Sequence, residues 1–326
     1  MNANRRSPLV IEPARRHELP AALRLAFQYL SADDQDARVA NALRLVRARE
    51  LDPAGVLVAR AGEQLLGAMM SMPVPGASGL VWPPQVTPGQ GRGPIEEQLV
   101  QAATRGLSRR GAKLAQSLLA PRDVPLADPL ERNGFVHTTS LWYMRHDLHL
   151  SAALLLPEDR LTYLSYAVGD PGVFHRTLLR TYEHSLDCPE VNGVRDIGEI
   201  IAGHRSQGCH DPDRWWLAQD GGNPVGVLLM TETPDLQGWD LSYLGVVPEA
   251  RRRGIGLQLA RKAIIETRAA EAAQLTLSVD ARNGPAWDLY RRLGFEPFDQ
   301  REVYLAIWPP VTRGVPPADT SPEDRP

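Results

Sequence analysis

The chain has 326 residues, of which 43% are hydrophobic and 23% are charged, and its formal net charge is -3 at pH 7. Single domains usually run to about 100–200 residues, so this length predicts two domains. The charge balance is not the strongly basic one of nucleic-acid-binding proteins, so we expect no nucleic-acid partner. No apolar run reaches the roughly 18 residues of a membrane span, and Cys188 and Cys209 form no CxxC pair. We therefore predict a cytoplasmic protein with no membrane contact and no disulfide.

The apolar spacing of residues 1–150 predicts alternating groups of strands and helices. In chain order, the expected elements are a strand at 9–13, helices at 17–30 and 33–50, a hairpin at 55–72, a strand at 79–86, a helix after Pro94, a strand at 114–119, a short helix, and a strand at 136–148. Residues 151–308 repeat this order with a strand at 160–168, helices at 173–186 and 195–205, a hairpin at 214–232, a strand at 239–247, a helix at 255–271, a strand at 274–279, a helix at 285–294, and a strand at 301–307.

A repeat of 160 residues underlies this pattern. Without a gap, "VTPGQGRGPIEEQL" (86–99) aligns to "VVPEARRRGIGLQL" (246–259), and "APRDVPLADPLERNGF" (120–135) aligns to "DARNGPAWDLYRRLGF" (280–295), with twelve of thirty positions identical. We infer a tandem duplication of the α/β (α+β) class, in which each half is a mixed, mostly antiparallel sheet flanked by helices. The expected domains are 1–150 and 151–308, followed by a tail at 309–326 whose Pro-, Asp- and Ser-rich composition predicts disorder.

The turn "RRRGIG" at 251–256 lies between a predicted strand and a predicted helix. Free N–H groups and the dipole at a helix N-terminus favour a phosphate, and glycines let it approach the backbone. The arginines add positive charge. A dinucleotide fingerprint is excluded because Leu259 occupies its third small position, and a P-loop because no Gly-Lys-Ser/Thr occurs. The turn alone predicts either a diphosphate site or a solvated helix cap.

Together with a second block, this turn resembles the GCN5-related N-acetyltransferase (GNAT) superfamily. The family's motif Gln/Arg-x-x-Gly-x-Gly/Ala is matched by Arg251, Gly254 and Gly256. Its block Asn-x-x-Ala-x-x-Leu-Tyr-x-x-x-Gly-Phe is matched by Asn283, Ala286, Leu289, Tyr290, Gly294 and Phe295. The resemblance covers about residues 158–308 and implies acetyl-CoA as the acyl donor. The CoA-binding residues it implies are Val246, Val247, Arg251, Arg252, Arg253, Gly254, Ile255, Gly256, Asn283 and Ala286.

The resemblance also implies direct transfer of the acetyl group to a primary amine, without a covalent enzyme intermediate. In this family the strand before the turn splays from its neighbour, and Gly245 is expected to mark the irregularity. A backbone N–H near Leu244 would stabilise the oxyanion of the tetrahedral intermediate. Tyr290 would protonate the departing thiolate, because a neutral phenol can donate a proton. The alternative for Tyr290 is a packing role on an amphipathic helix.

Two carboxylates are candidates for the general base. Asp240 precedes the turn and is expected to share one strand face with Ser242 and Leu244 because side chains alternate along a strand. The alternative is that Asp240 is only a solvated carboxylate at a strand end. Glu232 is a second candidate with weaker placement.

The acceptor-binding residues are expected in the loop after the first strand and helix of the second half. There "TYEHSLDCPEVNGVRD" (181–196) offers Glu183, Asp187, Glu190 and Asp196, whose charge would favour a cationic amine on a small molecule or a peptide. Solvated loop acids are the alternative. We expect no metal site, because His146, Asp147 and His149 lack further ligands.

The first half has lost these chemical groups. Leu130 stands at the position of Tyr290, and Pro94 and Glu96 stand at those of Gly254 and Gly256. Pro94 lacks an N–H, and the carboxylates of the helix start would face the positive end of its dipole. We predict a degenerate domain that keeps the fold.

These features predict an acyl-CoA-dependent N-acetyltransferase with its active centre in the C-terminal half. Two alternatives remain open. The layout of an active C-terminal and a weakened N-terminal copy is similar to that of mycothiol synthases, and a non-catalytic acyl-CoA-binding sensor or scaffold could keep the turn without the chemistry.

Overall fold

The computed structural model describes residues 8–89, 91–148, 160–234 and 237–308. The elements of the first half are β1 (Leu9–Pro13), α1 (Leu19–Ala26), α2 (Ala32–Arg47), η1 (Pro53–Gly55), β2 (Val56–Ala61), β3 (Gln64–Val74), β4 (Ser78–Val81), β5 (Gln85–Val86), α3 (Arg92–Arg109), β6 (Leu114–Leu119), η2 (Pro121–Ala127), α4 (Asp128–Glu131) and β7 (Val136–Asp147). The expected strand at 79–86 is two strands, because Pro83 and Pro84 interrupt it. The tail at 309–326 lies outside the described residues.

The second half has the same element order. Its elements are β8 (Leu161–Ser165), α5 (Pro171–Tyr182), η3 (Pro189–Val191), α6 (Ile197–Arg205), η4 (Pro212–Arg214), β9 (Trp215–Asp220), β10 (Asn223–Thr233), β11 (Gly238–Val246), η6 (Pro248–Ala250), α7 (Ile255–Ala269), β12 (Gln274–Asp280), α8 (Gly284–Arg292) and β13 (Glu296–Ile307). The predicted class, a mixed and mostly antiparallel sheet flanked by helices, is confirmed. None of the helices in the described ranges combines the length and the apolarity that a membrane span requires.

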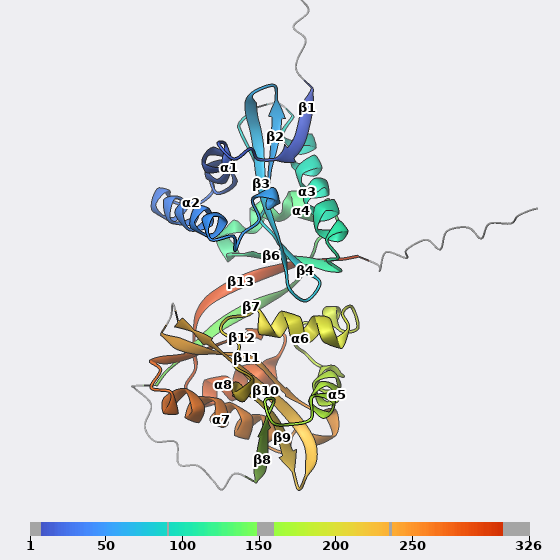
Figure 1. Cartoon of the computed structure of the whole chain (residues 1–326), viewed down its shortest axis with the longest axis vertical. Helices are drawn as coiled ribbons and strands as arrows, with labels where there is room; N and C mark the ends of the chain where they lie inside the picture. Colours follow the sequence, from blue (N-terminus) through green and yellow to red (C-terminus); the bar gives the residue numbers. More distant parts are fainter. Residues whose placement is uncertain (1–7, 90, 149–159, 235–236, 309–326) are drawn as a thin grey trace, which may run out of the picture.

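The strands of both halves form one continuous sheet in the order β1-β2-β3-β4-β6-β13-β7-β12-β11-β10-β9-β8, with β5 paired to β3 (Figure 1). The last strand of each half is exchanged. β13 lies between β6 and β7, and β7 lies between β13 and β12. Each half is therefore completed by a strand from the other, an arrangement that the element order alone does not predict.

The register of the sheet reproduces the 160-residue repeat. In the first half, residues 78–80 of β4 pair in parallel with residues 114–116 of β6. In the second half, residues 238–240 of β11 pair in parallel with residues 274–276 of β12. In both halves the two strands are joined by these three pairs alone. Beyond the pairs the strands separate, so both copies have a gap in the sheet at this point.

Helices cover both faces of the second half. On one face α7 and α8 pack against β10, β11 and β12 through a core that includes Leu228, Leu259 and Leu277. On the other face α5 and α6 pack against β9 and β10 through Phe174, Leu178 and Trp215. α6 is started by a capping box between Asp196 and Glu199.

The first half also touches α6 directly. A Cβ atom on Gly76, in the β3–β4 turn, would lie 2.9 Å from the Cα of Gly203, so only glycine fits this approach. The Lys113 Nζ lies 2.7 Å from Glu199 Oε2 and adds an ion pair across the two halves. These contacts join α6 to the first half.

Candidate functional site

The gap between β11 and β12 is the central feature of the candidate site. The two strands pair only as far as Asp240 and Thr276, after which β11 continues to Val246 and β12 to Asp280 without further pairing. Residues beyond the last pair therefore face an opening in the sheet. Leu244 and Asp280 both lie beyond the last pair, on opposite sides of this opening.

β11 is irregular, but at Ser242 and not at Gly245 as expected. In the pairing with β10, Leu241 faces Met230 and Tyr243 faces Leu229, so Ser242 is the extra residue of a bulge. Gly245 pairs regularly with Val227. It is small for another reason, since a Cβ there would lie 2.5 Å from Thr181 Oγ1 of α5.

The bulge also corrects the expected strand face. Asp240 pairs with Thr231, whereas Leu244 pairs with Leu228, and Leu244 packs in the core beneath α7 and α8. One extra residue inverts the alternation of side chains, so Asp240 and Leu244 point to opposite faces. The role predicted for Leu244 uses its backbone and is unaffected by this inversion.

Backbone alternation orients the N–H groups of β11. Val247 donates its N–H to the carbonyl of Val225 on the β10 side, at 3.0 Å. Because hydrogen bonding alternates along a strand, the N–H groups of Val246 and Leu244 point away from β10, toward the gap. The side chain of Arg251 bonds the Val246 carbonyl at 3.0 Å from the same side.

The turn at 251–256 leads into α7 without a side-chain cap. Gly254 is the N-cap residue with φ 82°, in the left-handed region that favours glycine. The first N–H groups of α7 have no capping side chain. A Cβ on Gly256 would meet its nearest atom, in Leu289, at 3.7 Å, so the fold itself tolerates a side chain there. Val247 and Ile255 are buried and support the turn from below.

The three arginines of the turn have different surroundings. Arg251 donates to the carbonyls of Thr181, Glu183 and His184 at the C-terminal end of α5, so its guanidinium is committed to the protein. Arg253 pairs with Asp220 at 2.6 Å. Arg252 is exposed, and no partner of its side chain is found in the described part of the chain.

α8 carries the second motif. The Oδ1 atom of Asn283 caps α8 by accepting the N–H of Ala286 at 3.3 Å. Tyr290 is 7% exposed and packs edge-to-face on Phe295. Its hydroxyl has no hydrogen-bond partner among the described residues. Burial raises the pKa of Tyr290, and the nearby charge of Asp187 adds to this, so the phenol is neutral at pH 7.

Asp240 lies at the closed end of the gap. Its Oδ1 accepts a hydrogen bond from Thr276 Oγ1 at 2.8 Å. Burial raises its pKa to about 6, although the Thr276 hydrogen bond acts in the opposite direction. This pKa suits a base that must lose its proton near neutral pH. Glu232 pairs with Trp239, one residue before Asp240, so its exposed side chain lies on the other face of the sheet.

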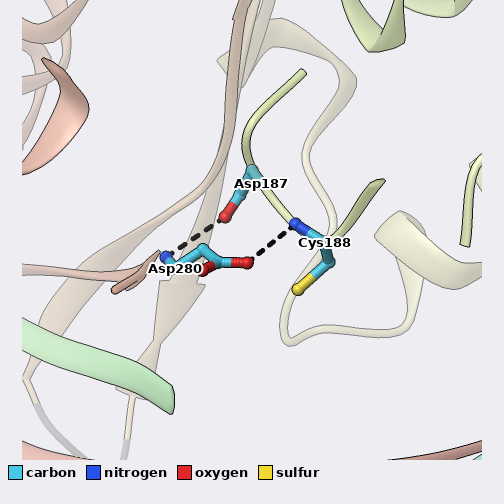
Figure 2. A group of neighbouring side chains, drawn as sticks. All are labelled: Asp187, Cys188 and Asp280. Carbon is cyan, nitrogen blue, oxygen red and sulfur yellow. Dashed lines mark hydrogen bonds between the residues drawn. The ribbon is translucent and has the colours of Figure 1, made fainter. Parts of the chain in front are cut away.

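Asp187 is the loop carboxylate that the structure brings to the mouth of the gap. Figure 2 shows its side chain beside Cys188 and Asp280, with Asp187 Oδ1 accepting the N–H of Asp280 at 3.2 Å. Burial raises the pKa of Asp187, and its charge contributes to the raised pKa values of Tyr290 and Tyr243. Asp187 is thus close to the candidate acid and to the residue before Leu244.

The Asp187, Cys188 and Asp280 ligand atoms lie within 4.8 Å of one another, which is compact enough for a metal ion. Asp280 is nevertheless already engaged by protein donors. Its oxygens accept the hydroxyl of Thr139, the N–H of Cys188 and the side chain of Arg282. Burial raises the pKa of the Cys188 thiol, which disfavours the thiolate that a metal would bind. The cluster is built as a hydrogen-bonded anchor, which sequence patterns do not reveal because its members are far apart in the chain.

The other acidic loop residues are placed differently. Glu183 is exposed and ends α5, Glu190 pairs with Arg282 at 2.6 Å, and Asp196 caps α6. His146 is buried against Phe295, and burial lowers its pKa, whereas His149 lies outside the described residues.

The corresponding turn of the first half is closed by its own side chains. α3 begins at Arg92, so Pro94 is in its first turn, but no acid is there, contrary to our expectation. Glu96 is instead buried, with its carboxylate 2.6 Å from Arg92 Nε and 3.4 Å from Arg132 Nη2. A pocket of about 290 Å³ lies beside these residues and is lined by Arg92, Glu96 and Arg132 among others.

Comparisons with known proteins agree with this geometry. Residues 179–295 match the model of the acetyltransferase (GNAT) family. Mycothiol acetyltransferase of Beutenbergia cavernae is 29% identical over 221 residues, which are 62% of this chain and 73% of that protein. Mycothiol acetyltransferase of Pseudarthrobacter chlorophenolicus is 26% identical over 249 residues, which are 74% and 75% of the two chains. The crystal structure of a GCN5-related N-acetyltransferase from Sphaerobacter thermophilus, 21% identical, has a TM-score of 0.59 and covers 92% of this chain and 96% of that one, which is a likeness of fold.

Proposed function

Because the chain is a GNAT-superfamily acetyltransferase that resembles mycothiol acetyltransferases, we propose that its C-terminal half moves an acetyl group from acetyl-CoA to a primary amine. The observation that carries the proposal is the gap between β11 and β12. It combines backbone N–H groups directed into it, two carboxylates, and a buried tyrosine whose hydroxyl has no partner in the described part of the chain.

The donor would lie along β11 with its pyrophosphate on the turn at 251–256. The uncapped first turn of α7 offers backbone N–H groups, and Gly256 leaves room beside them. Arg252 is the arginine of the turn whose side chain is free to meet a phosphate. Arg251 contributes through the backbone and by holding α5, and Asn283 and Ala286 contribute by starting α8. Val246, with its N–H toward the gap, would bind the pantetheine arm.

Each step of the transfer has a candidate group. Asp240 accepts a proton from the acceptor's ammonium, which frees the nitrogen lone pair for attack on the thioester carbonyl. Because Ser242 bulges, only three β10 positions, or about 10 Å, separate Asp240 from Leu244, so Asp240 would reach the reacting nitrogen through a chain of water molecules. The Leu244 N–H donates to the oxygen that gains charge, an interaction worth about 3 kcal/mol in comparable sites. Tyr290 gives its proton to the sulfur as the carbon–sulfur bond breaks. The new carbon–nitrogen bond leaves one surplus proton on the nitrogen, and this proton returns through water to the Tyr290 oxygen, which restores the phenol. The products are an amide and CoA.

The acceptor would be a cationic amine on a small molecule or a peptide. Asp187 supports this, since its carboxylate accepts the Asp280 N–H at the mouth of the gap and its charge acts on Tyr290. Glu183, at the exposed end of α5, would form the outer edge of the same site. The resemblance to mycothiol acetyltransferases favours their acceptor as the first compound to test, and an acetyltransferase for a different amine is the alternative.

Exchange of Tyr290 for phenylalanine tests the proposed chemistry. We expect Tyr290→Phe to bind acetyl-CoA with unchanged affinity in calorimetry and to lose about 100-fold in kcat, because an acid catalyst typically contributes a factor of 10² to 10⁴. CoA release would be followed with a thiol reagent over a panel of amino sugars, polyamines, amino-acid amides and the acceptor of mycothiol acetyltransferases.

The same panel separates the enzyme from a sensor. Tyr304→Phe is the matched control, since Tyr304 is equally buried but lies in the core of the first half. Tight acetyl-CoA binding without turnover of any amine, together with no effect of Tyr290→Phe, would favour a non-catalytic acyl-CoA-binding protein and contradict the proposal.

A further inference from the structure

Asp280, at the end of β12, is a fully buried carboxylate that nonetheless stays ionised. Burial raises its pKa, but hydrogen bonds from Arg282, Thr139 and the N–H groups of Arg282 and Cys188 outweigh that effect and lower the pKa to about 2. Burying a charge is costly unless donors surround it, and removing one partner leaves the charge uncompensated. The 160-residue repeat puts Ala120 at this position in the first half, so the fold itself does not require a carboxylate here.

The partners of Asp280 come from three separate segments. Thr139 Oγ1, in the exchanged strand β7, donates at 2.6 Å. Cys188 N–H, in the loop between α5 and α6, donates at 3.0 Å, and Arg282, just before α8, donates from Nη2 at 2.7 Å. One carboxylate thus joins the last strand of the first half, the loop between α5 and α6, and the start of the helix that carries Tyr290.

The loop is held a second time through Arg282. The guanidinium that binds Asp280 also contacts Glu190, with Nη1 to Oε1 at 2.6 Å and Nη2 to Oε2 at 3.0 Å. Cys188 adopts φ 43°, a left-handed conformation that is unfavourable for a residue with a side chain. The Asp280 bond to its N–H stabilises this conformation, which directs the chain so that Asp187 faces β12.

Asp280 also orients Asp187 with its own backbone, because its N–H donates to Asp187 Oδ1 (Figure 2). The side chain of Asp280 therefore holds Cys188, and its backbone N–H holds Asp187, the residue before it in the loop. The charged groups that face Asp187 from the packed elements are Asp280 and Arg282, and the nearby phenols are Tyr182, Tyr243 and Tyr290.

We propose that Asp280 is the positioning residue of the acceptor site, which holds the loop after α5 so that Asp187 meets the acceptor's ammonium beside Tyr290. The proposal rests on the proposed function for the identity of the reaction. It makes the exchanged strand β7 part of the second half's active centre through Thr139. It also identifies a second difference between the two halves, in addition to the lost glycine turn: the first half has Ala120 at the position of Asp280.

Asp280→Asn and Thr139→Val test this role. Asparagine keeps the size of the side chain but removes the charge and turns an N–H2 group toward donors, whereas valine removes only the hydroxyl of the partner. We expect both variants to raise KM about tenfold or more for the probe amines glucosamine and spermidine, a change equal to the loss of about one hydrogen bond to a charged group. The Kd for acetyl-CoA should stay within about twofold.

Hydrogen exchange gives a readout that needs no acceptor. The backbone amides of residues 186–194 should exchange about tenfold faster in both variants, while those of α7 stay as in the wild type. Thr139→Ser keeps the hydroxyl and should restore wild-type values. Thr138→Val makes the same change one residue earlier in β7, at a hydroxyl that donates to the Val136 carbonyl and does not contact Asp280, and should have no effect.

Two results would overturn the proposal. One is wild-type exchange in residues 186–194 and wild-type KM for the probe amines in a folded Asp280→Asn protein. The other is an equal weakening of amine binding and acetyl-CoA binding that accompanies a drop in Tm and that is also seen in Thr139→Ser. That pattern would indicate a merely structural role for Asp280. Failure of both amines to react, with tight acetyl-CoA binding, would instead count against the proposed function, and the exchange data would still decide on Asp280.

Discussion

At the scale of the residue, Asp240 is the side chain on which activity and stability make opposite demands. Burial raises its pKa from 3.8 to about 6, so the folded protein favours the neutral acid. A general base must be ionised, and at pH 7 holding this carboxylate ionised costs about 3 kcal/mol of folding free energy. With Asp240 as the proposed base, activity above pH 6 would depend on a charge that weakens the fold.

The variant Asp240→Asn should therefore be inactive but more stable. In the wild type, kcat/KM for the acceptor should rise with pH through about 6, because the base must lose its proton, and the variant should lack this rise. The folded pKa lies above the unfolded one, so the wild type loses stability as the pH rises from about 3.8 to 6 and the variant does not. The variant's Tm should be higher at pH 7, and the difference should shrink near pH 4. A pH–rate rise that persists in the variant would assign the base to Asp187.

Residues were predictable from the sequence where a local motif defines them. Asn283 and Tyr290 lie in one such motif, and the structure places them as a helix cap and a buried phenol. The role of Asp280 was not predictable, because it depends on the contact with Cys188, which is 92 residues away in the chain. Arg251 shows the converse, since its motif predicts a phosphate ligand but its guanidinium binds the end of α5.

At the scale of the element, one strand-turn-helix unit occurs twice with different outcomes. The period of apolar residues predicts the strands and helices of both copies but not all of their limits, since α1 spans only Leu19–Ala26 of the expected 17–30 and β13 begins at Glu296 and not at 301. It does not predict the bulge at Ser242, which depends on pairing with β10, or the extra helical turn that starts α3 at Arg92. In α3 the buried Glu96 fills the place beside the helix start, whereas Gly256 leaves it open in α7.

Gly256→Glu should accordingly abolish acetyl-CoA binding without unfolding the protein. The carboxylate would repel a phosphate at the start of α7, and the nearest atom to a new Cβ lies at an ordinary contact distance of 3.7 Å. Calorimetry should detect no binding, while Tm stays within about 3 °C of the wild type. Gly256→Ala controls for the side chain alone, and Glu96→Gln, which removes a carboxylate from the first half, should leave binding unchanged. Wild-type affinity in Gly256→Glu would place the pyrophosphate elsewhere.

At the scale of the whole molecule, the exchange of β7 and β13 makes the two halves one folding unit. β13 forms six residue pairs with β6 of the first half, and β7 forms seven with β12 of the second. The repeat in the sequence reveals two copies but not the exchange. The order of elements along the chain would be the same if each half kept its own last strand. Each half alone would expose a sheet edge that the full chain covers.

The chain should therefore unfold in one cooperative transition, and neither half should fold by itself. A fragment ending at residue 148 would keep β7 but lose the β13 strand that separates it from β6, and a fragment starting at 158 would leave β12 without β7. Differential scanning calorimetry of the full chain should show a single peak, and the separate fragments should be digested by protease within minutes under conditions in which the full chain survives. A truncation after residue 295 is the sharper test, because it removes a strand next to β6 but leaves the gap, Tyr290 and Asp280 intact in sequence. If that protein still folds and binds acetyl-CoA, the exchange is dispensable. If it unfolds throughout, the proposed active centre of the second half depends on the first half, which supplies β7 and receives β13.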